Sequence, residues 1–301
     1  MADVRFDGRV AIVTGAGGGL GRAHALLLAS RGAKVVVNDL GGAFDGSGSG
    51  STTMAQKVCD EIKAAGGEAV PDYNSVSTPD GAAGIVKTAL DKFGKLDIVI
   101  NNAGILRDKS IVKMEEEDWR KVIQVHLDGS YFVTKAAWES LRANNYGRVI
   151  FTTSAAGLYG NFGQTNYSAA KMGIVGLVNT LKLEGQKYNI YSNAIAPIAG
   201  TRLTATVMPQ AMLDMLKPEA VSPMVAYLCS EECTVNGKVF SAGAGHFAVA
   251  QMLESKGATI RGDVTIESVR EKMDQIMDMN GAVTIGNASE AGGKVFAALS
   301  S

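Results

Sequence analysis

The chain has 301 residues, of which 46% are hydrophobic and 20% are charged, and its formal net charge is −1. A charge so close to zero gives no electrostatic basis for nucleic-acid binding, and no run of about twenty apolar residues predicts a membrane span. The length fits one enzyme domain with an extension better than two independent domains.

The N-terminal segment has the pattern of a strand, a glycine-rich turn and a helix. Residues 9–14 form an apolar, β-branched run, and helix-forming residues begin at Arg22. Between them, backbone without side chains can approach a pyrophosphate, and the helix N-terminus offers unpaired N–H groups. An ordinary tight turn is the structural alternative. The cofactor contacts predicted in this turn are Gly15, Gly19, Leu20 and Gly21.

The second and third strands are predicted to bind the adenosine half of a dinucleotide. Residues 34–38 form a strand that ends at Asp39, whose carboxylate can accept hydrogen bonds from ribose hydroxyls and would repel a 2′-phosphate. This favours NAD over NADP, although Asp39 is also a common turn or helix-cap residue. After residues 69–73, the cofactor contacts are predicted at Asn74, Ser75 and Val76, because an Asn side chain offers both a donor and an acceptor.

The middle of the chain carries the candidate catalytic groups. Tyr167 and Lys171 are four residues apart in a predicted helix, so they share a face, and Ser154 follows a predicted strand. A nearby ammonium lowers a phenol pKa, which fits Tyr167 for proton transfer while Ser154 polarises a substrate oxygen. The spacing alone is weak evidence, because Tyr131 and Lys135 share it without a glycine-rich turn or a serine.

These residues resemble the short-chain dehydrogenase/reductase family. The resemblance rests on Thr14-Gly15-x-x-x-Gly19-x-Gly21, Asn101-Asn102-Ala103-Gly104, Ser154 and Tyr167-x-x-x-Lys171. Residues 38–42, 104–108, 159–164 and 216–219 are similar to the (3R)-hydroxyacyl-CoA dehydrogenase units of peroxisomal multifunctional enzymes of type 2. The resemblance implies further cofactor contacts at Asn101, Ala103, Gly104, Tyr167, Lys171, Pro197, Ala199 and Thr201.

His126 departs from the general family pattern. Family members usually have Asn at this place, where it takes part in a proton relay, whereas the subgroup tends to have His. His126 is therefore a candidate catalytic residue, and the alternative is a helical histidine bonded to a backbone carbonyl.

The alternation of segments predicts a Rossmann-like, doubly wound parallel seven-stranded sheet with helices on both faces and a C-terminal helical extension. We expect one NAD-binding domain, 1–301, in which residues from about 248 form the extension. In the resembled enzymes this extension covers the site or the dimer contact, which implies a homodimer. Predicted helices cover residues 52–65, 79–93, 117–142, 166–188 and 219–229. The later strands are predicted at residues 96–101, 148–153, 191–196 and 238–242.

The resemblance implies NAD-dependent oxidation of (3R)-3-hydroxyacyl-CoA to 3-ketoacyl-CoA. A 17β-hydroxysteroid or other bulky secondary-alcohol dehydrogenase is the alternative, and a catalytically silent NAD-sensing protein is a second. Residues 201–217 are a candidate lid over an acyl-CoA or steroid substrate. Candidate contacts to CoA phosphates are Arg107, Lys109, Lys113 and Arg202, each of which could equally be a solvated surface charge.

No metal site is predicted, because Cys229 and Cys233 have no second ligand pair nearby and Cys59 stands alone. The N-terminus has no signal-peptide hydrophobic region, and the last residues differ from a Ser-Lys-Leu-type address. The expected location is the cytoplasm, with the peroxisome as the alternative.

Overall fold

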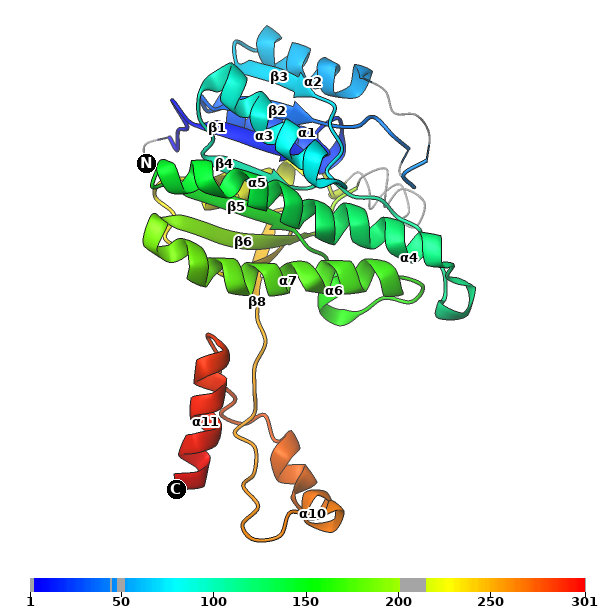
Figure 1. Cartoon of the computed structure of the whole chain (residues 1–301), viewed down its shortest axis with the longest axis vertical. Helices are drawn as coiled ribbons and strands as arrows, with labels where there is room; N and C mark the ends of the chain where they lie inside the picture. The colour runs from blue at the N-terminus through cyan, green and yellow to red at the C-terminus, as the bar shows by residue number, and fades with distance from the viewer. Residues whose placement is uncertain (1–2, 44, 48–51, 201–214, 301) are drawn as a thin grey trace. The chain divides into compact units, whose positions relative to one another are not determined.

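The computed structural model describes residues 3–43, 45–47, 52–200 and 215–300. The chain divides into two compact units, Met1–Val249 and Ala250–Ser301. The first unit is built on an eight-stranded sheet in the order β3-β2-β1-β4-β5-β6-β7-β8 (Figure 1). The strands are β1 Val10–Thr14, β2 Lys34–Asn38, β3 Glu68–Asp72, β4 Ile98–Asn101, β5 Gly147–Thr152, β6 Ile190–Pro197, β7 Val239–Gly243 and β8 His246–Ala250.

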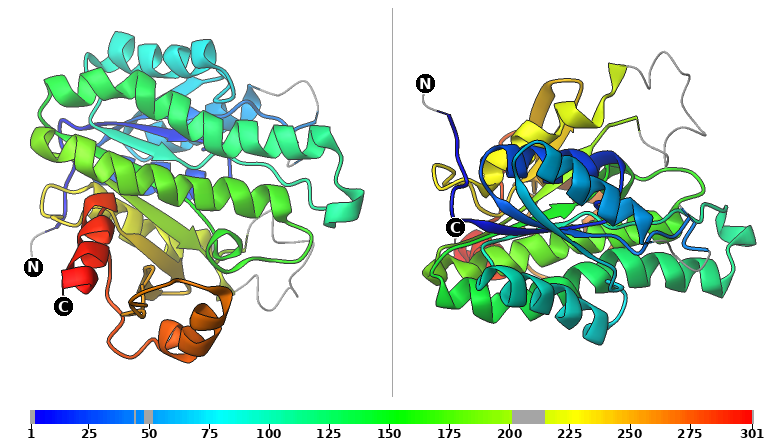
Figure 2. Two further views of the ribbon diagram at one scale, coloured as in Figure 1. Left: turned by 60° about the horizontal axis from the view of Figure 1, so that its bottom comes forward. Right: turned by 90° about the horizontal axis from the view of Figure 1, so that it is seen from above.

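Helices lie on both faces of this sheet (Figure 2). On one face α3, α5 and α7 pack against one another, and on the other α1 packs against α2 and α9. The helices are α1 Gly19–Ser30, α2 Thr53–Ala64, α3 Pro79–Phe93, α4 Glu116–Ile123, α5 Gly129–Ala143, α6 Ala155–Tyr159, α7 Thr165–Gly185 and α9 Ser222–Cys229. Shorter helical segments are η1 Ile111–Lys113, η2 Gln124–Asp128, η3 Gln186–Tyr188 and η4 Pro218–Ala220.

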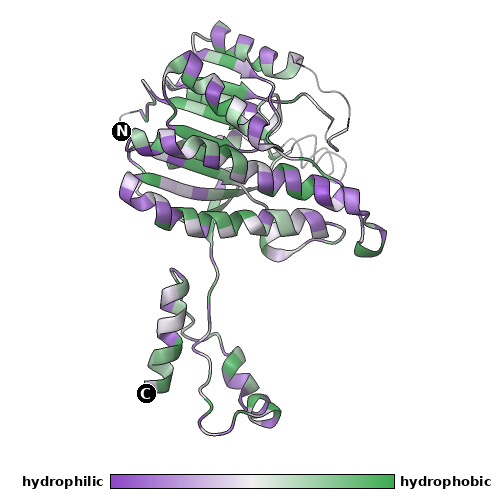
Figure 3. Ribbon diagram, viewed as in Figure 1, coloured by the Kyte–Doolittle hydropathy of each residue, from purple (hydrophilic) through white to green (hydrophobic). Residues whose placement is uncertain are grey.

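Burial on both faces explains why the strands read as continuous apolar runs rather than as alternating patterns. Every residue of β1, β4 and β5 is buried, and Figure 3 shows these strands mostly in the colour of hydrophobic residues. Each Val, Ile or Phe buried in this way contributes about 1.5–3 kcal/mol to folding. All three cysteines are buried free thiols.

The predicted parallel seven-stranded sheet with helices on both faces is confirmed, because β1 to β7 pair in parallel. The sequence did not predict β8. It follows β7 after two residues of positive φ, Ala244 at 48° and Gly245 at 81°. Two such residues make the tight turn of a hairpin, so β8 extends the sheet at its edge.

The predicted helix over residues 117–142 is confirmed, because helical residues run without a break through α4, the π-helical turn η2 and α5. The π-helical turn within it was not predicted. A π-helical turn inserts one extra residue into the helix, and such turns occur frequently at functional sites. Here it carries His126.

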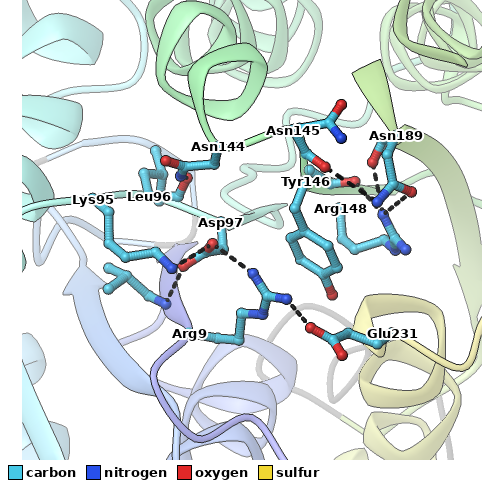
Figure 4. Close-up of polar contacts among 12 residues, drawn as sticks. Arg9, Lys95, Leu96, Asp97, Asn144, Asn145, Tyr146, Arg148, Asn189 and Glu231 are labelled. Atoms are coloured by element: carbon cyan, nitrogen blue, oxygen red, sulfur yellow. Dashed lines mark hydrogen bonds and ion pairs between the residues drawn. The ribbon is translucent and has the colours of Figure 1, made fainter. Parts of the chain in front are cut away.

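A charged cluster fastens the amino ends of the strands (Figure 4). The buried carboxylate of Asp97 accepts hydrogen bonds from the Val10 N–H at 2.9 Å and from Arg9 at 3.0 Å. The ammonium of Lys95 lies 3.0 Å from the same carboxylate. The Arg9 guanidinium lies 3.6 Å over the ring of Tyr146. The cluster joins β1 to the segments that precede β4 and β5, at the end of the sheet opposite the glycine-rich turn.

The second unit contains two helices, α10 Ile266–Met277 and α11 Ala288–Ser300. A capping box begins α10, in which the side chains of Thr265 and Ser268 bond to each other's backbone N–H. Residues Glu254 and Val283 pair in an antiparallel bridge, and Lys294 lies 2.7 Å from Glu254. Neither helix buries a residue. Within the described part of the chain, no helix is both long enough and apolar enough to cross a membrane.

Candidate active site

The glycine-rich turn brings backbone to a place where side chains would not fit. A Cβ on Gly15 would lie 2.7 Å from the Cα of Ala103, and a Cβ on Gly21 would lie 2.3 Å from the Gly15 carbonyl. Gly15 and Gly19 have φ of 63° and 53°, a region that favours glycine. No side chain caps α1, and no acidic residue lies in its first turn. The N–H groups at this helix end are therefore open to an anion such as a pyrophosphate.

Thr14 and Asn102 join this turn to the loop after β4. The Thr14 hydroxyl accepts hydrogen bonds from the N–H groups of Asn102 at 3.0 Å and Ala103 at 3.1 Å. The Asn102 amide donates back to the carbonyls of Thr14 at 3.0 Å and Gly15 at 3.2 Å. Both residues lie within the sequence motifs, but neither was predicted to have a role in the site. Their polarity next to the glycines is the signal that could have identified them.

Asp39 lies at the same turn, where β2 ends. Its carboxylate accepts hydrogen bonds from the N–H groups of Gly17 at 2.8 Å and Gly41 at 2.7 Å. An ionised carboxylate offers about four lone-pair sites, so two backbone bonds leave room for ribose hydroxyls. Its negative charge is fixed beside the start of α1, where it would also repel a second phosphate.

The residues predicted to contact adenine are organised by the buried Asp72. Asn74 donates to the Asp72 carboxylate from its backbone N–H at 3.0 Å and from its side chain at 2.9 Å. The side-chain bond uses one of the N–H donors of Asn74 that were predicted to contact adenine. Ser75 accepts a hydrogen bond from the Ser77 N–H at 3.1 Å, and Val76 is buried against Gly129.

Ser154, Tyr167 and Lys171 come together where β5 ends. Ser154 precedes α6 and caps it, accepting a bond from the Ala156 N–H at 3.2 Å. Packing of α6 against α7 brings the Ser154 hydroxyl close enough to Tyr167 to lower the pKa of its phenol. The Lys171 ammonium is 5.4 Å from the centre of the Tyr167 ring and donates to the Thr152 carbonyl at 2.5 Å.

The pKa of Tyr167 is raised, contrary to the lowering expected from the sequence. Burial of the phenol raises this pKa, the Ser154 hydrogen bond lowers it, and the charge of Asp108 raises it further. Lys171 does not reverse this shift, because burial lowers the pKa of its own ammonium to about 7. Near neutral pH, Lys171 is therefore charged only part of the time.

His126 lies against Tyr167. The two rings meet edge to face with centres 5.1 Å apart, and His126 Nε2 is 2.8 Å from the carbonyl and 3.1 Å from the nitrogen of Ile105. A Cβ on Gly104 would lie 2.3 Å from the ring. Burial holds the pKa of His126 well below its usual range, so the ring is neutral. Its Nδ1 is buried without a partner among the described residues, and the relay role stays a prediction.

Asn101 and the loop after β6 complete the predicted cofactor contacts. The side chain of Asn101 donates to Thr134 at 2.9 Å, and its Oδ1 is buried without a partner among the described residues. Pro197 ends β6 and Ala199 is buried. Thr201 lies outside the described residues, as do residues 201–214 of the predicted lid.

Two of the cations predicted to contact CoA phosphates form ion pairs within the chain instead. Arg107 lies 3.0 Å from Glu117, and the Lys109 ammonium lies 2.7 Å from Asp118. Both are therefore paired with carboxylates of α4. Lys113 is exposed, and Arg202 lies outside the described residues. Among the described residues, no group of three His, Cys, Asp or Glu could hold a metal ion.

The chain is similar to proteins of known name. A family model described as short chain dehydrogenase matches residues 9–214. The chain is 51% identical over 299 residues to peroxisomal multifunctional enzyme type 2 of Mus musculus, which covers 98% of this chain and 40% of that protein. This chain thus spans less than half the length of that relative.

The chain is also similar to solved structures. Full-length peroxisomal multifunctional enzyme type 2 from Drosophila melanogaster superposes with a TM-score of 0.84 at 44% identity, covering 99% of this chain and 50% of that chain. A 7α-hydroxysteroid dehydrogenase complexed with NADH and 7-oxo glycochenodeoxycholic acid gives a TM-score of 0.73 at 27% identity, covering 81% of this chain and 98% of that chain.

Proposed function

Because this chain belongs to the short-chain dehydrogenase family, whose members are oxidoreductases acting on a CH–OH group with a nicotinamide cofactor, we propose that it oxidises (3R)-3-hydroxyacyl-CoA to 3-ketoacyl-CoA with NAD. The observation that carries this proposal is the convergence of Ser154, Tyr167 and Lys171 at the same edge of the sheet as the glycine-rich turn. The substrate class is supported by a relative from Mycobacterium tuberculosis named hydroxyacyl-CoA dehydrogenase ChsB1, which is 41% identical to this chain over 254 residues.

The residues of this chain divide the acid–base work. Ser154 holds the oxygen of the substrate hydroxyl, and Tyr167 takes its proton as the C3–H bond is broken. An oxidised nicotinamide cofactor, held by the glycine-rich turn and Asp39, would supply the hydride acceptor. The Lys171 ammonium, whenever it is protonated, opposes the effect of burial on the Tyr167 pKa.

The preference for NAD is supported by Asp39. Its carboxylate is held by the Gly17 and Gly41 N–H groups at the end of β2. A 2′-phosphate on the adenosine ribose would meet this negative charge, whereas a 2′-hydroxyl can donate a hydrogen bond to it.

Two other functions remain to be separated from this one. A dehydrogenase of steroids or other bulky secondary alcohols would use the same serine, tyrosine and lysine, because these residues recognise only the carbinol. A silent NAD-sensing protein would bind the cofactor without turnover. The complete catalytic set argues against it, since a sensor has no need of a proton acceptor beside a polarising serine.

The test is NADH formation measured across one panel of substrates. The panel contains (3R)- and (3S)-hydroxyacyl-CoA esters of several chain lengths, the corresponding free hydroxy acids and hydroxysteroids. We expect the (3R) thioesters to be oxidised far faster than their (3S) epimers. A preference for a steroid over every thioester would establish the first alternative, and cofactor binding without turnover of any alcohol would establish the second.

We also propose a homodimer, on the basis of the second unit. The helices of this unit carry large apolar side chains that are exposed, among them Ile266 at 85%, Phe296 at 72% and Leu299 at 58%. Such side chains need a further surface to pack on, and a second copy of the chain would provide it. The cytoplasm stays the proposed location and the peroxisome its alternative, which imaging of a fluorescent fusion would decide.

A further inference from the structure

The loop after β4 carries three consecutive charged residues, Arg107, Asp108 and Lys109. The first and the third form ion pairs with carboxylates. Arg107 and Lys109 face the α4 carboxylates of Glu117 and Asp118 at 3.0 Å and 2.7 Å. Asp108 instead accepts a hydrogen bond of 2.7 Å from the neutral side-chain amide of Gln164. Among the described residues Asp108 forms no ion pair, so the loop presents one uncompensated negative charge.

This charge is held close to the reacting groups by the start of α7. Gln164 immediately precedes α7 and lies three residues before Tyr167, and its own amide oxygen accepts a bond from Asn161 at 2.9 Å. The same helix start is tied to the loop by Asn166, whose side chain donates to the Arg107 carbonyl at 3.0 Å. These bonds hold the Asp108 carboxylate at the start of the helix that carries Tyr167.

The field of Asp108 reaches the Tyr167 phenol, whose pKa it raises. Partial burial raises the pKa of the Asp108 carboxyl itself, and the Gln164 bond lowers it. The other polar groups facing the phenol are the Lys171 ammonium, the neutral His126 ring and the Ser154 hydroxyl. Asp108 is the carboxylate among them, and it is exposed to solvent, where a substrate can approach it.

Resting on the proposed function, we propose that Asp108 is a specificity residue that favours the neutral thioester over the free 3-hydroxy acid by charge repulsion. With the C3 hydroxyl on Ser154 and Tyr167, C1 of the substrate lies only two bonds from C3. A free carboxylate at C1 would thus lie near the phenol and within the field of Asp108, and two like charges repel each other. A thioester has no charge at C1, and its phosphates are distant along the pantetheine arm. Repulsion of the wrong ligand is a general route to specificity.

The test compares the free (3R)-hydroxy acid with its CoA thioester at the chain length that the enzyme oxidises best. In Asp108→Asn, the ratio of kcat/KM for thioester over acid should fall about tenfold, or ~1.4 kcal/mol. The acidic limb of the thioester pH profile should also move to lower pH, because the phenol loses a neighbouring negative charge. Asp108→Glu keeps the charge and should retain both properties. Asp91→Asn, an exposed carboxylate of α3 paired with Lys87, removes one charge away from the site and should change neither.

An unchanged ratio in Asp108→Asn would overturn this inference while leaving an active thioester dehydrogenase. A ratio that falls equally in Asp108→Glu would also overturn it, because shape rather than charge would then be responsible. The proposed function fails separately, if the unmodified enzyme oxidises no thioester at all.

Discussion

The chain has two tyrosine–lysine pairs with the same spacing, and they differ in how deeply they are buried. In both pairs the lysine lies near the ring, at 5.6 Å for Lys135 over Tyr131 and 5.4 Å for Lys171 over Tyr167. Tyr131 is 43% exposed on α5, where solvent screens the ammonium. Lys171 is 2% exposed, and burial lowers its pKa to about 7. In the second pair, Ser154 is also close enough to lower the pKa of the Tyr167 phenol.

Replacement of Tyr167 by Phe should reduce turnover by roughly 10²–10⁴-fold, the usual contribution of a positioned acid or base. The ring is retained, so NAD should bind with nearly unchanged affinity. Steady-state kcat and a cofactor titration measure the two quantities. Tyr131→Phe is the matched control and should keep its turnover. Near-normal activity of the Tyr167 variant would show that another group accepts the proton.

Asp39 should set the choice between the two nicotinamide cofactors. We expect kcat/KM with NAD to exceed that with NADP by at least about tenfold, or ~1.4 kcal/mol. Asp39→Ala removes the repulsive charge and should reduce this preference. It also removes the acceptor of the Gly17 and Gly41 N–H groups, so KM for NAD should rise. Asp60→Ala, an exposed carboxylate of α2, is the control. Equal efficiencies in the unmodified enzyme would contradict the assignment.

At the scale of elements, the sequence predicted what local pattern determines. The runs that became β1 and β2 were predicted to within one residue, and parallel pairing then placed the glycine-rich turn, Asn101 and Ser154 at one edge of the sheet. The η2 turn was not predictable, because one inserted residue hardly alters hydrophobic periodicity over residues 117–142. Helix α6 has five residues, too few for a periodic signal.

The partners of charged side chains were also beyond prediction from the sequence. Arg107 and Lys109 were candidate contacts to CoA phosphates, because nothing in the local sequence showed where α4 would lie. Packing of α4 against α7 places Asp118 beside the loop, and this long-range arrangement decides the matter. The same limit applies to Asp108, whose partner Gln164 is distant in sequence.

The packing of α1 against α9 should make stability depend on pH. His24 of α1 is 1% exposed and lies 2.8 Å from the Ser222 hydroxyl of α9, and burial lowers its pKa to about 4. The pKa of an unfolded histidine is about 6.5, so below that pH the unfolded chain takes up a proton that the folded chain refuses. Stability should fall as pH decreases from about 6.5 to 4, by up to about 3 kcal/mol from this residue.

Urea unfolding at several pH values from 7.5 to 4.5 measures this effect. His24→Gln can keep a bond to Ser222 but cannot take a proton, so its stability should decline less steeply with falling pH. The difference between variant and unmodified protein isolates His24 from the buried His126, which both proteins retain. Parallel pH dependences of the two proteins would contradict this explanation.

At the scale of the whole molecule, the second unit predicts self-association. Light scattering on a size-exclusion column should give twice the mass of one chain, and the melting temperature should rise with protein concentration. Phe296→Ser combined with Leu299→Ser removes two exposed apolar side chains of α11 and should weaken the dimer. Leu90→Ser, an exposed leucine of α3, is the control. A monomeric mass at all concentrations would disprove the proposal.

The charged cluster around Asp97 has a consequence for how such a protein can diversify. Its partners Arg9, Lys95 and the Val10 N–H secure the amino ends of the strands, whereas the reacting groups follow their carboxyl ends. Mutations in the loops that follow the carboxyl ends of the strands leave the contacts of Asp97 unchanged. A randomised library over those loops should therefore yield mostly folded proteins, and the chain is a good starting scaffold for selecting dehydrogenases of new alcohols.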